Sequence, residues 1–152
     1  NSLSLRQEVN TMKYKRYIFP ILMGMIMSNI MSLLNTGKIV FPAIFVMMTV
    51  QSVISSIASL IFPAGLVGAK ITKKLFPDLQ YATFLLISSV LPAIYFTAIM
   101  SISGLLRMKG FSADFWHIYF SSLPVYTIYG YTVSIFLNLI LDKLLNSKRF
   151  SK

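Results

Sequence analysis

Four stretches of the chain are apolar and free of charge, and polar segments separate them. They cover residues 17–34, 40–62, 81–106 and 115–141. The apolar residues are continuous rather than alternating, and each stretch is too long for a strand. As a helix rising 1.5 Å per residue, each one is able to cross the ~30 Å hydrocarbon layer of a bilayer. The pattern predicts an all-α integral membrane protein with four transmembrane helices.

The polar segments divide the chain into a short extension, two pairs of spans and a tail. Their bounds are 1–12 for a polar N-terminal extension, 13–75 and 76–146 for the first and second membrane hairpins, and 147–152 for a basic tail. The basic residues before the first span are typical of a signal peptide, but no small-x-small cleavage site follows the apolar run. We therefore expect a retained first helix.

Lysine and arginine gather on one side of the predicted spans. Eleven of the 14 lie before the first span, between the second and third, or after the fourth, and the other three are Lys38, Arg107 and Lys109. Cytoplasmic loops of membrane proteins carry such an excess of cations. The asymmetry predicts two like-oriented helical hairpins in a cell membrane (plasma or inner), with both termini cytoplasmic. It also predicts attraction to anionic headgroups of the inner leaflet, at about 1 kcal/mol per residue.

Composition excludes several other classes of protein. The 152 residues are 56% hydrophobic and 12% charged, with a net charge of +10 and a mean hydropathy of +0.73. A soluble domain has about a quarter charged residues, and a disordered chain has few apolar ones. Because the cations are divided among three short segments beside spans, we expect no nucleic-acid partner. With no Cys, one His and four acidic residues, we expect no enzyme, no cofactor and no metal centre.

The two halves of the chain align at a distance of about 72 residues. Phe19-Pro20-Ile21-Leu22 aligns with Leu91-Pro92-Ala93-Ile94, and Leu33-Leu34 aligns with Leu105-Leu106. After a one-residue insertion, Gly37 aligns with Gly110. Each half then consists of a helix, a short turn, a second helix and a basic end, which predicts an internal repeat. Both copies enter the membrane from the same side, unlike the halves of inverted-repeat transporters.

The first half also resembles a known family. The stretch Ser28-Asn29-Ile30-Met31-Ser32-Leu33-Leu34-Asn35-Thr36-Gly37, with Pro20 upstream, is similar to small bacterial two-span membrane hairpins grouped as a domain of unknown function. Their Met- and Ser-rich first helix closes on an Asn-Thr-Gly turn. The likeness covers residues 14–74 and is weak over 81–145, where Arg107-Met108-Lys109-Gly110 replaces that turn. The resemblance implies a bacterial inner or plasma membrane protein, here in two tandem copies, and no catalytic or binding residue.

Small residues recur every four positions on the predicted helices. Such spacing lets helix backbones approach closely in lipid, where packing and hydroxyl hydrogen bonds drive association. A hydroxyl-lined path for a polar solute is the alternative, and packing is favoured because the spans contain no ionisable residue. We expect helix packing through Gly24, Ser28, Ser32, Ser52, Ser56, Ala93, Thr97 and Ser101.

The first span carries Met23, Met27 and Met31 in one stripe. Thioethers are soft ligands that suit copper(I), so a soft-metal site is one hypothesis. We favour packing, because Met fills irregular interfaces well and neither Cys nor His lies near the stripe.

The amides within the spans are Asn29, Gln51 and Asn138. We expect Asn29 and Gln51 to hydrogen-bond across the first hairpin. Asp142, at the end of the fourth span beside Lys143, is expected to be solvated.

Two prolines, Pro92 and Pro124, lie within the third and fourth spans. Each removes a backbone hydrogen bond and is expected to bend its helix. If the two bends face each other, they open a polar pocket for a small molecule or lipid, lined by Tyr126 and Tyr129. The alternative is that the bends only accommodate packing.

The start of the fourth span holds Asp114, His117 and Ser121 on one helix face, a superficial likeness to a hydrolase triad. Such triads draw on separate elements and need an oxyanion hole. We favour an aromatic belt at the membrane interface, formed by Phe111, Phe115, Trp116 and Tyr119, with Asp114 as a helix cap.

These patterns favour a non-enzymatic accessory or structural membrane subunit that associates with itself or with a larger complex. The alternative is a small oligomeric carrier or channel for a neutral, lipidic or soft-metal solute. Saturable flux in liposomes favours the carrier, and a stable partner without flux favours the subunit.

Overall fold

The computed structural model describes residues 2–39 and 41–147, with side chains for 14–39 and 41–145. Helices make up all the regular secondary structure of these residues: α1 (Ser2–Thr36), α2 (Ala43–Ile61), α3 (Ala64–Leu75), α4 (Tyr81–Ser88), α5 (Val90–Lys109) and α6 (Phe115–Ser147). Four stretches are long and apolar enough to cross a membrane: Tyr14–Thr36, Ala43–Ile61, Tyr81–Lys109 and Phe115–Leu145. The structure confirms the predicted all-α fold with four membrane-spanning helices.

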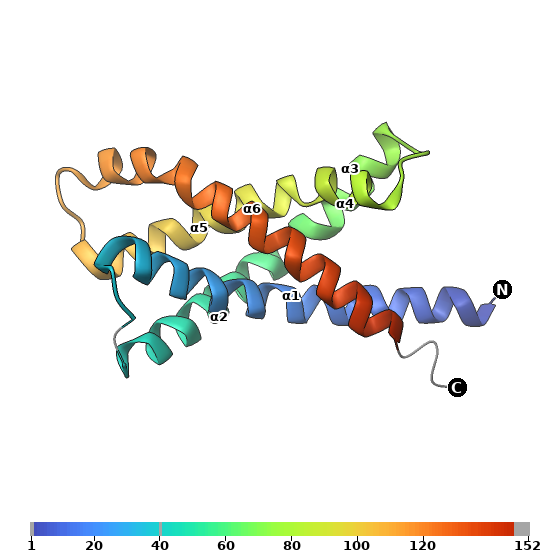
Figure 1. The fold of residues 1–152 in the computed structure, drawn as a ribbon, viewed down its shortest axis with the longest axis horizontal. Helices are drawn as coiled ribbons and strands as arrows, with labels where there is room; N and C mark the ends of the chain where they lie inside the picture. The colour runs from blue at the N-terminus through green and yellow to red at the C-terminus, as the bar shows by residue number, and fades with distance from the viewer. Residues whose placement is uncertain (1, 40, 148–152) are drawn as a thin grey trace.

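Both short turns of the bundle lie at the same end (Figure 1). We call the end that holds the α1–α2 and α5–α6 turns the turn end, and the opposite end, where α1 begins and α6 ends, the terminal end. The most extensive contacts join α1 to α2 and α5 to α6, while α1 also packs on α6 and α2 on α5. Each half of the chain therefore packs chiefly as a pair of helices. How the two pairs are oriented in a membrane stays a prediction.

The second predicted span is followed by a separate helix. Sequence analysis places the span at 40–62, whereas α2 covers Ala43–Ile61 and α3 begins at Ala64. Pro63 separates the two helices, because a proline has no N–H with which to continue the hydrogen-bond ladder of α2. The buried face of α3 consists of small residues, Ala64, Gly68 and Thr72.

The third predicted span, 81–106, is interrupted at Ser89, between α4 and α5. Pro92 lies in the first turn of α5 and has no N–H for the carbonyl of Ser88, four residues earlier. That carbonyl faces α3, where a Cβ added to Gly68 would lie 2.7 Å from its oxygen. The expected bend at Pro92 is thus a break in the helix, whereas Pro124 lies inside the continuous α6.

The first and last helices extend beyond their predicted bounds. α1 begins at Ser2, so the predicted polar extension continues the first helix. α6 runs to Ser147 rather than ending near residue 141. The remainder of the predicted basic tail, 148–152, lies outside the described residues.

The two glycines that align between the halves end their helices in the same way. Gly37 follows α1 with φ +69°, and Gly110 follows α5 with φ +65°. Glycine adopts this left-handed conformation without a Cβ clash. Each glycine donates its N–H to a carbonyl four residues earlier, Leu33 at 2.9 Å and Leu106 at 3.0 Å. Both turns therefore begin with the same helix-ending device.

Gly24, one of the predicted packing residues, lies where the backbones of α1 and α2 come close together. A Cβ on Gly24 would lie 2.7 Å from the backbone carbonyl of Gln51 and from Cα of Ser52. Real Cβ atoms do not approach backbone so closely, so only glycine permits this contact. The predicted role of Gly24 in close helix approach therefore has a specific partner surface on α2.

Serines of α2 donate hydrogen bonds to backbone carbonyls of α1. Ser52 Oγ donates to the carbonyl of Ile21 at 3.1 Å, Ser55 Oγ to that of Pro20 at 2.5 Å, and Ser59 Oγ to that of Arg16 at 3.5 Å. The Arg16 carbonyl is the one that the missing N–H of Pro20 leaves free. Because hydrocarbon offers no hydrogen-bond partner, Ser59 supplies a donor where the ladder of α1 is interrupted, and Ser52 and Ser55 add bonds to carbonyls one turn further along α1.

We expect Gly24→Ala to destabilise the bundle by about 1–3 kcal/mol, because the new methyl group must push α1 away from α2. The measurement is thermal unfolding of the purified protein in detergent. Gly65→Ala is the matched control, since a Cβ there meets no atom within 4 Å, and alanine improves helix propensity by up to about 1 kcal/mol. Equal melting temperatures for the two variants would contradict the close approach.

Candidate functional site

The small residues predicted to pack helices make contacts within this one chain. A Cβ on Gly104 would lie 3.3 Å from Sδ of Met31, and one on Gly130 would overlap Oγ1 of Thr97. Ser52 and Ser56 are half-buried. The other predicted packing residues are buried: Gly24, Ser28, Ser32, Ala93, Thr97 and Ser101.

The methionine stripe of α1 lies at the centre of the hydrophobic core. Met23 and Met27 are fully buried, Met31 is 4% exposed, and Met100 of α5 is buried in the same cluster. α1 and α5 run in the same direction (Figure 1), and Met31 meets Gly104, so Met27 is level with Met100. Within the described residues, no group of three or more His, Cys, Asp or Glu is placed to hold a metal ion. This finding does not cover methionine sulfur, so a soft-metal site formed by Met23, Met27 and Met31 stays a prediction.

Three buried hydroxyls beside this core have no hydrogen-bond partner. They belong to Thr97 and Ser101 of α5 and to Ser134 of α6, each at most 1% exposed. Thr97 Oγ1 lies against Gly130, which is one turn from Ser134 on α6, and Ser101 is one turn from Thr97 on α5. Because α5 and α6 run in opposite directions, the hydroxyls follow one another along the bundle at intervals of about one turn, ~5–6 Å. We call them the hydroxyl column.

Hydrogen-bonded polar pairs flank the hydroxyl column. Toward the terminal end, Asn138 Nδ2 donates to Ser89 Oγ at 3.0 Å. Toward the turn end, Tyr126 OH donates to Asn35 Oδ1 at 2.9 Å. Polar groups therefore follow the contact of α6 with α5 and α1 through much of the bundle, and only the middle ones are unpaired.

Gln51 joins α2 to α5 rather than to α1. Its Nε2 donates to the carbonyl of Met100 at 3.3 Å, and its Oε1 accepts from Ser103 Oγ at 2.9 Å. Asn29 instead donates to the carbonyl of Met25 in its own helix, at 2.8 Å. The expected bond between Asn29 and Gln51 is therefore wrong, because α2 packs between α1 and α5 and the buried Gln51 side chain lies on the α5 face.

Tyrosines bind backbone carbonyls near both helix breaks. Tyr95 OH donates to the carbonyl of Ala58 in the last turn of α2, at 3.0 Å. Tyr131 OH donates to the carbonyl of Leu86 in α4, also at 3.0 Å. The Ala58 carbonyl also accepts the N–H of Phe62 at 2.9 Å, so the bond from Tyr95 adds to that of the helix, whereas Tyr131 supplies a donor near the end of α4.

A hollow of about 250 Å³ opens on the surface between α5 and α6. It is lined by Val90, Ala93, Ile94, Thr127, Ile128 and Tyr131. None of the four residues predicted to form a pocket lines it. Tyr126 is buried and bonded to Asn35, while Tyr129 and Pro124 are exposed and Pro92 is buried.

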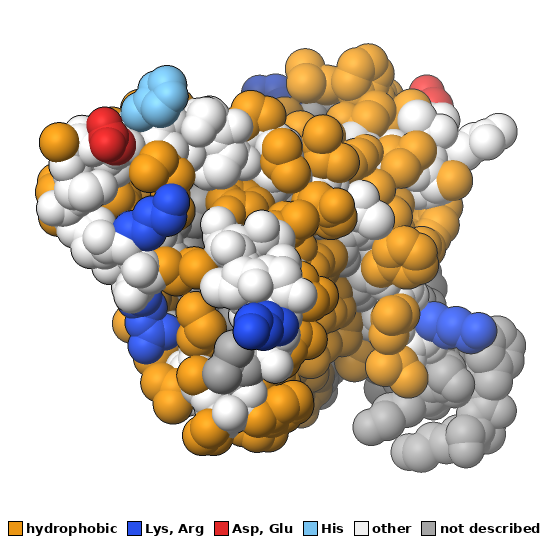
Figure 2. Space-filling view, turned by 60° about the vertical axis from the view of Figure 1, so that its left-hand side comes forward, with side chains coloured by type: hydrophobic (Ala, Val, Ile, Leu, Met, Phe, Trp, Pro, Cys, Tyr) orange, Lys and Arg blue, Asp and Glu red, His pale blue; other side chains and the backbone are white. Residues whose placement is uncertain are grey.

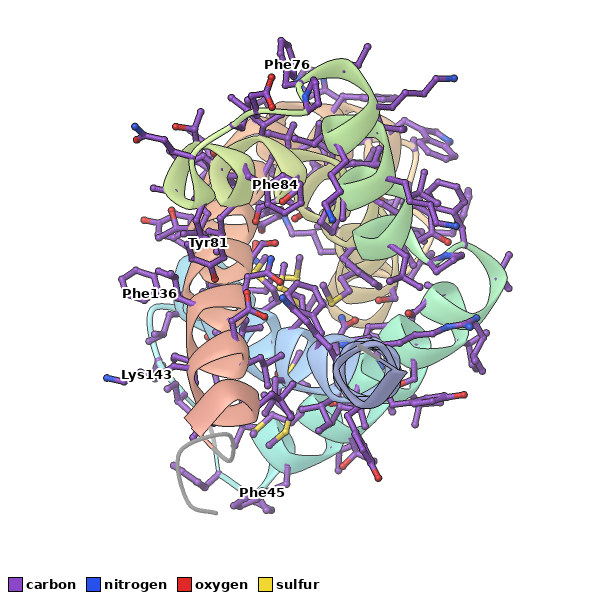
Figure 3. The ribbon with its side chains drawn as sticks, turned by 90° about the vertical axis from the view of Figure 1, so that its right-hand side faces the viewer. Phe45, Phe76, Tyr81, Phe84, Phe136 and Lys143 are labelled. Carbon is purple, nitrogen blue, oxygen red and sulfur yellow. The ribbon has the colours of Figure 1, made fainter. Side chains whose placement is uncertain are left out.

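Asp142 joins three helices at the terminal end. Lys15 Nζ pairs with Asp142 Oδ1 at 2.8 Å, and Tyr81 OH donates to Oδ2 at 2.7 Å. The Lys15 and Asp142 side chains are 27% and 25% exposed. Figure 3 shows Tyr81 beside α6 and Lys143 pointing away from the bundle. Asp142 therefore stays partly exposed to solvent, and α1 and α4 each present a partner to it that sequence analysis did not indicate.

The turn end carries the residues that superficially resemble a triad. Asp114, His117 and Ser121 are exposed, and Ser121 Oγ donates to the carbonyl of Ile118 in its own helix, at 3.0 Å. In Figure 2, basic and acidic side chains lie on this end while the flank is largely hydrophobic. Beside them is a cluster of packed aromatic rings, formed by Phe111, Phe115, Trp116, Tyr119 and Phe120. This arrangement favours an interfacial belt over a catalytic site.

Sequence reasoning missed Ser89, Ser134 and Tyr95 as polar contacts of the interior. Ser134 follows Gly130 by four residues, so the small-residue spacing that marks the other spans was available as a signal. Nothing in the local pattern marks Ser89 or Tyr95, because their partners, Asn138 and Ala58, are distant in the sequence.

Comparisons with protein-family models, with curated proteins and with solved structures find no match for this chain.

A double-mutant cycle with Lys15→Met and Asp142→Asn is expected to give a coupling of about 0.2–1 kcal/mol, since the pair is partly solvent-accessible. Thermal unfolding in detergent at low and high salt measures it, and screening should reduce the coupling at high salt. Lys143→Met is the matched control, because that side chain points away from the bundle. Strictly additive effects of the two substitutions at low salt would contradict a stabilising pair.

Proposed function

We propose that the protein is a non-enzymatic accessory or structural subunit of a cell membrane, which associates with itself or with a larger complex. The observation that carries this proposal is a contrast between the two sides of α2. Ser52, Ser55 and Ser59 face α1 and are bonded there, so they are not available to a partner. Its other side presents large apolar side chains outward.

The outward side of α2 supports association through side-chain packing. Val46, Val53, Ile57 and Leu60 are each more than half exposed. Three of the four are β-branched and lose little rotamer freedom when a neighbouring helix packs on them. The α2 span is 28% buried and the α6 span 22%, against 44% of the α1 span. We call these four residues the α2 outer face and propose it as the surface that meets a partner helix.

Charge supports an orientation with both termini in the cytoplasm. The described cations at the terminal end are Lys15, Arg16, Lys70, Lys73, Lys74 and Lys143, and those at the turn end are Lys38, Arg107 and Lys109. The positive-inside rule assigns the more basic end to the cytoplasm. In that orientation the basic end meets the anionic headgroups of the inner leaflet.

A small carrier for a neutral solute is the second candidate function. It is favoured by the hydroxyl column, since the unpaired hydroxyls of Thr97, Ser101 and Ser134 lie inside the bundle. Hydrogen-bonding groups that are not used for packing are what a path for a neutral polar solute requires.

Disulfide cross-linking tests the subunit proposal directly, because the chain has no cysteine of its own. We expect Val53→Cys and Ile57→Cys, oxidised in native membranes, to form a product of at least about twice the 17.2 kDa monomer mass. Ile128→Cys is the control and is expected to remain monomeric, because Ile128 lies on α6 and is more exposed (68%) than Val53 and Ile57 (52% each).

The subunit proposal fails if cysteines on the α2 outer face cross-link no more than the α6 control. Saturable flux of a neutral solute through liposomes that hold the purified protein would then favour the carrier.

A further inference from the structure

The unpaired state of the hydroxyl column is unusual among the hydroxyls of this bundle. Most Ser and Thr side chains of the described helices donate to a carbonyl three or four residues earlier in their own helix. These are Ser28, Thr36, Thr49, Ser55, Ser56, Thr72, Ser88, Ser103, Ser121, Ser122, Thr127 and Thr132. Thr97, Ser101 and Ser134 also lie within helices, but their hydroxyls donate no such bond to a carbonyl of their own helix. Their hydroxyls are thus free to bind something else.

The surroundings of the column decide which kind of ligand it suits. The buried polar residues of the described chain are Ser, Thr and Gln, all neutral, so the interior has no charge to balance an ion. Hydroxyls both donate and accept hydrogen bonds. A small uncharged molecule that also does both is therefore the matching chemistry, and water is the simplest such molecule.

The spacing of the column fits water. Thr97 and Ser101 are one helical turn apart on α5, ~5–6 Å, and Ser134 is offset from Thr97 by about one turn along the bundle. One water that makes two hydrogen bonds of about 2.8 Å spans the distance of one turn. Met23 lies beside the column, with its Cε 3.6 Å from the Cβ position of Gly130. Methionine has three rotatable bonds and is able to move aside, which makes room between the helices.

We propose that the hydroxyl column binds a file of water molecules inside the membrane, between the Asn138–Ser89 pair and the Tyr126–Asn35 pair. The waters satisfy Thr97, Ser101 and Ser134 as buried waters satisfy unpaired groups in other proteins. This inference does not depend on the proposed subunit role, because hydration of the interior and association through the α2 outer face involve different residues.

Thiol reactivity measures hydration at single positions, because only the ionised thiolate reacts and it forms only in contact with water. We expect Thr97→Cys, Ser101→Cys and Ser134→Cys to react with hydroxyethyl methanethiosulfonate in native membranes at least about tenfold faster than lipid-facing controls. The controls are Ile94→Cys and Ile128→Cys, on the same two helices and 50% and 68% exposed to lipid. Equal rates at all five positions would overturn the proposal.

Stability gives a second readout that needs no cysteine. If the column is dry, Thr97→Val removes a costly unsatisfied hydroxyl without changing side-chain shape, and the melting temperature rises by about 2–4 °C. If water satisfies the hydroxyl, the melting temperature stays the same or falls, and this is the result we expect. Thr132→Val is the control, because the Thr132 hydroxyl donates to the carbonyl of Ile128 in its own helix. Its change in melting temperature is the baseline for replacing threonine by valine. A rise for Thr97→Val above that baseline would overturn the proposal.

Discussion

Hydrocarbon offers no hydrogen-bond partner, and this constraint governs how the bundle is built. Near several interruptions of a helix, a side chain of another helix supplies a hydrogen bond. Ser59 donates to the Arg16 carbonyl that Pro20 leaves free, Tyr131 donates to the carbonyl of Leu86 near the end of α4, and Asn138 donates to the hydroxyl of Ser89 between α4 and α5. Neighbouring helices therefore contribute polar contacts at these breaks, so fold and polar contacts are determined together.

The same constraint separates the inside of the molecule from its outside. Glycine, serine and methionine are concentrated where α1, α2, α5 and α6 meet, and large apolar side chains cover the surface. Packing of this kind leaves two features unexplained by stability alone: the outward apolar face of α2 and the unpaired hydroxyls beside Met23. The first favours association with another helix, and the second favours a small neutral ligand. The α2 outer face supports a subunit that packs on a partner, and the hydroxyl column supports a carrier. Different residues form the two features.

Hydropathy was sufficient to predict the four spans and the helical fold, because a length of apolar residues is a local property. The end of the second span before Pro63 was predicted, but the separate helix α3 and the break at Ser89 were not. A proline within a span, such as Pro92, is compatible with a bend or with a break, and the choice depends on the position of Gly68 beside Ser88. The partners of Gln51 and Asp142 depend on which helices are neighbours, so no spacing within the chain indicates them. Small-residue spacing identified Gly24 and Thr97 correctly as buried contacts, but not which helix each one meets.

The central claim is that lipid surrounds this bundle and that its two ends face opposite sides of the membrane. Impermeant maleimide labelling of single cysteines at Lys73 and Lys109, which lie at the basic end of α3 and the turn end of α5, tests it most directly. We expect Lys109→Cys to be labelled in intact cells and Lys73→Cys only after permeabilisation. Labelling of both positions from the same side would contradict a bundle that spans the membrane with its terminal end inside.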